Sequence, residues 1–128
     1  MKSHEVEIWN LANELGATQV PDDTPIGLKH LAHLMRFHNA VMGGGLSFAV
    51  EISSPEDIDR AQCGAQYLGL TDVAALIGRF AGPDKDYELA EELDHEYYKT
   101  TGEDAANTSV IDPAFGRRLA TSPADFGL

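Results

Sequence analysis

The chain is poor in the residues that would place it outside the cell or in a membrane. It holds a single cysteine, Cys63, so no disulfide forms within the chain and a reducing compartment is favoured. No apolar run approaches the roughly 18 residues that span a bilayer. Residues 1–7 carry acids and lack the apolar stretch of a signal peptide. We therefore expect a cytoplasmic protein without a membrane segment.

Basic residues are also scarce. Nine Lys and Arg stand against 21 Asp and Glu, which gives a net charge of −12 with His neutral. Affinity for phosphates comes from Lys and Arg, so direct binding to nucleic acid or to an anionic membrane is disfavoured. A basic protein partner fits better, because long-range attraction would steer it towards the chain. Solubility alone also explains an acidic balance in many cytoplasmic proteins.

Motifs for nucleophilic catalysis and phosphate binding are missing. No Gly-x-Ser-x-Gly occurs, and the glycines at 43–45 lack the Lys-Ser/Thr of a phosphate loop. Cys63 lies in an alanine-rich segment and is most simply a small core residue. We therefore predict no catalytic residue, no cofactor and no enzyme activity.

Histidines offer the one route to a metal enzyme. Glu92 and His95 form a Glu-x-x-His step, but the second copy that a di-iron bundle needs is absent. His30 and His33 lie one helical turn apart, with His38 further along, and a zinc site needs a third ligand. Histidines at the solvent edge of helices are the simpler interpretation, and we predict no metal. A metal-dependent hydrolase built on His30, His33, Glu92 and His95 is the alternative.

Apolar residues recur at three- and four-residue steps along most of the chain, the period of amphipathic helices. We expect helices over residues 3–16, 25–43, 46–52, 55–69, 71–82, 84–99 and 112–119, with a terminal turn from 122. The glycines at 43–45 predict a stop or kink, with Gly44 or Gly45 in a backbone conformation or packing distance closed to other residues. The fold class is therefore all-α, a single compact domain of six to seven helices over residues 1–128. The expected core includes Trp9, Leu31, Leu34, Leu68, Leu76, Ile77, Leu89, Leu93 and Tyr97.

The expected helix over 84–99 carries the most pointed feature. Residues 84–104 hold nine acids and two bases. Helical phase places most of the acids on one face and the apolar residues opposite. Over roughly 18 Å of helix the charge density is about one per 2.6 Å, near the one per ~1.7 Å of duplex DNA. The candidate partner-binding residues are Asp84, Asp86, Glu88, Glu91, Glu92, Asp94 and Glu96. A solvated helix face is the alternative.

The order of several segments resembles a known family. The segments are Val41-Met42-Gly43-Gly44-Gly45-Leu46, residues 65–76, the acidic residues 91–98 and a final Pro123-Ala124-Asp125-Phe126. Together, over about residues 28–126, they are similar to the bacterial DNA-mimic-protein family, the DNA-mimic protein nineteen C-terminal-like domain. Family members usually carry Glu and Asn where this chain has Ala40 and Gly43. The resemblance implies an all-helical domain without known catalysis. The family is named for an acidic member that imitates DNA to occupy a DNA-binding protein.

These observations favour an acidic, non-enzymatic binding protein. Its carboxylates would stand in for phosphates, each meeting an Arg or Lys of a basic DNA-binding regulator. An immunity protein or antitoxin that neutralises a basic toxin is an alternative built on the same acids. A homodimer is left open by the sequence.

Overall fold

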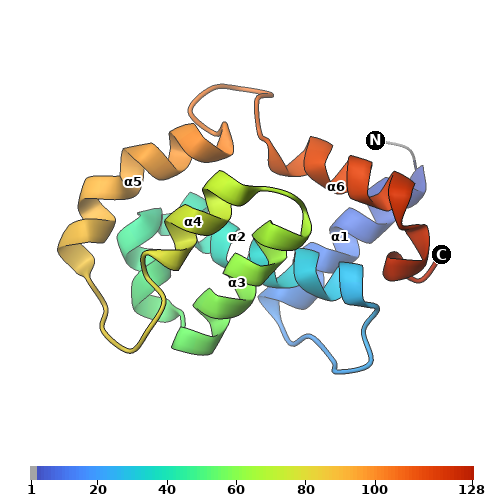
Figure 1. Ribbon diagram of the computed structural model, residues 1–128, viewed down its shortest axis with the longest axis horizontal. Helices are drawn as coiled ribbons and strands as arrows, with labels where there is room; N and C mark the ends of the chain where they lie inside the picture. Colours follow the sequence, from blue (N-terminus) through green and yellow to red (C-terminus); the bar gives the residue numbers. More distant parts are fainter. Residues whose placement is uncertain (1–2) are drawn as a thin grey trace.

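The computed structural model describes residues 3–128 and is helical throughout its ordered elements (Figure 1). In this part of the chain the elements are α1 (Ser3–Ala17), α2 (Ile26–Ile52), α3 (Pro55–Tyr67), α4 (Thr71–Gly78), α5 (Tyr87–Thr101), α6 (Ile111–Thr121) and the 3₁₀ turn η1 (Pro123–Phe126). No strand occurs within residues 3–128. The expected all-α single domain is therefore confirmed. Among these helices, none combines the length and the hydropathy needed to cross a membrane.

The long helix α2 is the centre of the packing. It contacts α1, α3, α5 and η1, and Figure 1 shows it running through the middle of the molecule. Its apolar positions recur at helical spacing, so that most of its length is covered by neighbours. The buried residues of α2 are Gly27, Leu28, Leu31, Ala32, Leu34, Met35, Phe37, His38, Val41, Leu46, Ala49 and Val50.

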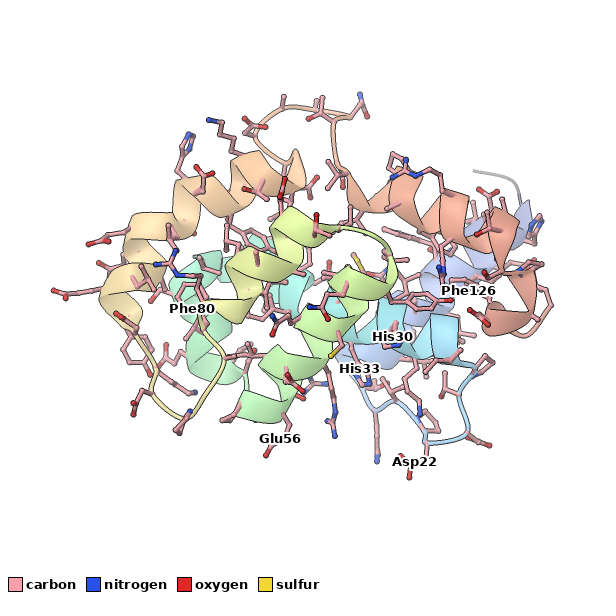
Figure 2. The ribbon with its side chains drawn as sticks, in the orientation of Figure 1. Asp22, His30, His33, Glu56, Phe80 and Phe126 are labelled. Atoms are coloured by element: carbon pink, nitrogen blue, oxygen red, sulfur yellow. The ribbon has the colours of Figure 1, made fainter. Side chains whose placement is uncertain are left out.

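The C-terminal turn closes one end of this core. Phe126, labelled in Figure 2, is buried and packs edge-on against Phe115 and Tyr67. The Tyr67 hydroxyl donates to Asp125 at 2.6 Å, and the Arg118 guanidinium lies 4.1 Å from the centre of the Tyr67 ring. These contacts hold α6 and η1 against the end of α3.

The glycine run at 43–45 kinks α2, as the sequence predicts. Gly45 has φ +90° and ψ 169°, outside helical geometry, and a second helical stretch begins at Leu46. The expected short helix over 46–52 is thus confirmed as the second part of α2. The Leu46 amide donates to the Asp94 carboxylate of α5 at 2.8 Å, which replaces the carbonyl partner lost at the kink. The kink therefore joins α2 to α5.

The start of α5 differs from the expected position. The helix begins at Tyr87, three residues after the predicted start at 84, and ends at Thr101 before the left-handed Gly102. Asp86 is the N-cap residue, and its carboxylate accepts from the Leu89 amide at 3.0 Å. An aspartate is among the preferred N-cap residues, so the cap sets this boundary. Helix α6 begins one residue before the expected position, at Ile111, and α4 ends four residues early, at Gly78.

Most residues of the expected core are buried, and the others lie at its rim. Six of the nine expected residues are buried, namely Leu31, Leu34, Leu68, Leu76, Ile77 and Tyr97. Trp9, Leu89 and Leu93 are instead half-buried and pack against the rim of the core. These three residues belong to the edge of the core, because α1 and α5 are outer helices with one face towards solvent.

The kink gives a direct test in two alanine variants. Gly45→Ala forces a side chain into a positive-φ conformation and should lower the free energy of unfolding by about 1–3 kcal/mol. Gly43 is helical with open space around it, so Gly43→Ala should leave stability unchanged or raise it by up to about 1 kcal/mol. Urea melts of both variants measure the difference. Equal melting of the two would contradict the kink.

Candidate functional site

Four glutamates form an exposed acidic face on α5, and we use this name for Glu88, Glu91, Glu92 and Glu96. All four are exposed, and α5 lies at an outer edge of the molecule in Figure 1. The helical period places them within an arc of about 140° and along about 12 Å of helix axis. The opposite side of α5 is the one that buries Ala90 and Tyr97.

No ion pair within residues 3–128 neutralises the acidic face. The ion pairs within residues 3–128 join Arg36 and Arg60 to Asp57, and Arg118 to Asp125. None of these pairs includes a glutamate of the acidic face. Lys99 is the one Lys or Arg in α5, and it stands towards the far end of the helix. Like charges three and four residues apart on a helix cost a few tenths of a kcal/mol per pair, so this face retains repulsion.

The other predicted partner-binding acids lie elsewhere. Asp94 is half-buried and points to α2, where it accepts from the Leu46 amide, so its expected place in the solvent-facing stripe is wrong. Asp86 caps α5, and Asp84 lies in the connection before the helix. In that connection Lys85 donates to the Glu51 carbonyl, which holds the connection against the end of α2. The seven acids therefore divide into four free glutamates and three aspartates with different surroundings.

The histidines of the metal-enzyme alternative are not brought together with its acid. Figure 2 shows His30 and His33 side by side on α2, away from α5, which carries Glu92 and His95. Within residues 3–128 no group of three or more His, Cys, Asp or Glu is placed to hold a metal ion. The His30 ring stacks on Tyr67 with centroids 4.6 Å apart. Burial, followed by the nearby charges of Lys29 and Arg118, lowers the pKa of His30.

A cleft of about 490 Å³ opens between α1, α2 and the connection from α5 to α6. We call it the His38 cleft. Its lining residues are Trp9, Asn10, Asn13, Met35, His38, Asn39, Met42, Glu103, Asn107, Ser109, Ile111 and Asp112. His38 is almost fully buried there, with Nδ1 2.9 Å from the Tyr97 hydroxyl and Nε2 3.0 Å from a Glu103 carboxylate oxygen. His38 in the wall of the cleft thus links the buried Tyr97 behind it to the partly exposed Glu103, in a Tyr–His–Glu chain of hydrogen bonds.

The protonation state of this chain follows from its surroundings. Burial lowers the pKa of His38, and the hydrogen bond and charge of Glu103 and the charge of Asp112 oppose this in part. Burial also raises the pKa of Tyr97 far above its ordinary value, so the hydroxyl keeps its proton. Neutral His38 then donates from Nε2 to Glu103 and accepts at Nδ1 from Tyr97. A protonated ring would donate from both nitrogens and leave the Tyr97 proton without an acceptor, which disfavours that state.

Sequence reasoning missed the His38 cleft. His38 lies 59 residues from Tyr97 and 65 residues from Glu103 along the chain. Helical period places Tyr97 in the core correctly, but it gives no sign that the hydroxyl meets a histidine. A buried apolar face with one histidine in it, between Leu34 and Val41, is the only local signal.

Comparisons with protein-family models, with curated proteins and with solved structures each found no match. The resemblance to the DNA-mimic-protein family therefore stays a prediction.

Removing the Tyr97 hydroxyl tests the buried chain of hydrogen bonds. Tyr97→Phe leaves Nδ1 of His38 buried without a donor, so the free energy of unfolding should fall by about 1–3 kcal/mol at neutral pH. Tyr87→Phe is the matched control, because Tyr87 is 45% exposed, and the free energy of unfolding should fall by no more than about 0.5 kcal/mol in this variant. Denaturant melts report both values. Equal losses in the two variants would contradict the assigned hydrogen bond.

The lowered pKa of His38 predicts acid-sensitive stability. The ordinary histidine pKa is 6.5, so between the lowered value and 6.5 the unfolded chain binds more protons than the folded one. Stability therefore rises with pH across this window and is lost as the pH falls through 6.5. His30 and His33 act with the same sign, because their pKa values are lowered as well.

The contribution of His38 to this pH dependence is the difference in the free energy of unfolding between the wild type and His38→Gln. Glutamine stays neutral at every pH, and the repulsion among the acids is common to both chains. Urea melts from about pH 5 to pH 8 at constant ionic strength measure the free energy of unfolding of both chains. The value for the wild type minus that for His38→Gln should grow as the pH rises through 6.5. A difference that does not change with pH would contradict the buried neutral histidine.

Proposed function

We propose that the chain is a non-enzymatic binding protein whose acidic face engages a basic surface of a nucleic-acid-binding protein. The observation that carries this proposal is the set of four exposed glutamates on one side of α5, none of them in an ion pair within the described residues. Such a face has unsatisfied charge that a cationic partner would neutralise. The carboxylates would meet Arg or Lys side chains in the places that phosphates take in a nucleic-acid complex.

The spacing of the charges supports this choice of partner. Four carboxylates over about 12 Å of helix axis are on average about 4 Å apart, comparable with the ~3.4 Å between phosphates along one DNA strand. The density is lower than the sequence suggests, because Asp94 faces α2 and the helix begins at Tyr87. The acidic face therefore compares with a single strand of phosphates rather than with both strands of a duplex.

The rigidity of α5 supports the proposal further. Ala90 and Tyr97 are fully buried under the helix, and Asp86 and Asp94 hold its N-terminal end and its middle. A partner would meet charges that are already arranged on a fixed helix, so little ordering of the backbone is needed on binding. Each exposed pair contributes about 1 kcal/mol or less, so affinity would come from several pairs acting together.

Charge removal on the acidic face tests the proposal. Changing Glu88, Glu91, Glu92 and Glu96 together to Gln keeps the helix and removes four charges. A pull-down from the native host should then lose its basic partner, identified by mass spectrometry. The wild-type complex should weaken steeply between low and physiological salt, because exposed charges are screened. Stability of the variant should be unchanged or higher, since like-charge repulsion is relieved.

The matched control removes four exposed acids from other faces, namely Glu7, Glu14, Asp22 and Asp59. This control variant has the same net charge as the acidic-face variant and should keep the partner. A competition assay then measures whether the wild-type chain displaces labelled duplex DNA from the purified partner. Displacement indicates imitation of DNA, and its absence indicates neutralisation of a toxin at another surface. Retention of the same partner and salt dependence by the acidic-face variant would overturn the proposal.

A further inference from the structure

The His38 cleft has the composition of a site for a positively charged ligand. Its lining includes the carboxylates of Glu103 and Asp112 and contains neither Lys nor Arg. The amide side chains of Asn10, Asn13, Asn39 and Asn107 add hydrogen-bonding groups around it. An anionic ligand would be repelled by both carboxylates. Asn39 donates to Asn13, and Asn13 donates to the Trp9 carbonyl, so a wholly apolar ligand would cover mainly the carboxylates and the amides of Asn10 and Asn107 without pairing them.

Glu103 is held in place at the cleft. One of its carboxylate oxygens accepts from Nε2 of His38 at 3.0 Å, and His38 is itself held by the Tyr97 hydroxyl. The Glu103 side chain is 25% exposed, whereas that of His38 is 4% exposed. A carboxylate fixed at the edge of the protein interior attracts a cation more strongly than one that moves freely in water, because the local dielectric constant is lower.

The rest of the lining suits an aliphatic stem behind a cationic head. Met35, Met42 and Ile111 supply apolar surface, and Trp9 supplies the ring type with the strongest cation–π attraction. The volume of about 490 Å³ falls in the range of small-molecule sites, roughly 300–1,000 Å³. The cleft lies among α1, α2 and the α5–α6 connection, and none of its lining residues belongs to the acidic face.

We propose that the His38 cleft binds an organic cation, a guanidinium or ammonium head on a short aliphatic stem, with Glu103 and Asp112 facing the head. Both a free alkylguanidine or alkylamine and the side chain of an arginine or lysine in a protein carry this chemistry. The amides of the cleft accept the remaining N–H groups of the head. This site is independent of the proposed function, since it uses other residues.

Tryptophan fluorescence measures binding directly, because Trp9 is the only tryptophan of the chain and lines the cleft. The probe is n-butylguanidinium, titrated into the purified chain at low salt, with uncharged n-butylurea as the matched control ligand. We expect a saturable change in Trp9 emission with the guanidinium and none with the urea at the same concentrations. Acetyl-Gly-Arg-Gly-amide forms a second arm. Binding of this peptide shows that a protein side chain is accepted, and binding of n-butylguanidinium alone shows that the ligand is a free molecule.

Two variants locate the site. Glu103→Gln keeps an acceptor for His38 but removes the charge, and it should lower the affinity for n-butylguanidinium by about tenfold or more. Asp112→Asn, at an exposed position, should also lower this affinity. Glu96→Gln removes one charge from the acidic face and should change the affinity by less than about twofold. Thermal melts confirm that each variant is folded, and Asp112→Asn decides the matter if Glu103→Gln unfolds.

The proposal is overturned if n-butylguanidinium and n-butylurea give the same response or none. It is also overturned if every folded variant at Glu103 and Asp112 binds as the wild type does. Neither result bears on the acidic face, so the two proposals fail separately.

Discussion

The docking of α5 on α2 is the constraint on which both candidate surfaces depend. Gly45 leaves helical geometry, so the Leu46 amide loses its partner within α2, and Asp94 of α5 accepts it at 2.8 Å. Near the end of α5, Tyr97 meets His38 of α2 through a second polar contact. These contacts, with the buried apolar surface between them, fix which side of α5 faces solvent. The acidic face and the wall of the His38 cleft follow from that orientation.

The acids of α5 therefore serve two purposes that composition alone does not separate. Asp86 and Asp94 satisfy backbone amides, and each stabilises a helix start in the way that an N-cap does. The four glutamates of the acidic face satisfy nothing within the described chain and keep their mutual repulsion. Solubility needs acids on the surface, but it does not need them together on one rigid helix without bases between them. This concentration is why we favour a partner over a solvated surface.

Local signals in the sequence predicted the fold well and the sites only in part. Helical period and the glycines at 43–45 are short-range features, and they marked helices and a kink that the structure contains. Helical phase gave the wrong surroundings for Asp94. It tells which side of a helix a residue occupies, but it does not show that an unpaired amide of another helix lies within hydrogen-bond distance. The packing of α2 against α5 brings together His38, Tyr97 and Glu103. Their spacing along the chain therefore does not predict the contact.

The most direct test of this account is amide hydrogen exchange at Leu46, followed by nuclear magnetic resonance in two variants. Asp94→Ala removes the acceptor, so the Leu46 amide should exchange at least about tenfold faster than in the wild type, as expected for a lost hydrogen bond of about 1.5 kcal/mol or more. The variant with four glutamines on the acidic face should leave this amide as protected as before. Unchanged protection in Asp94→Ala, or lost protection in the glutamine variant, would contradict the division of the α5 acids into structural and free groups.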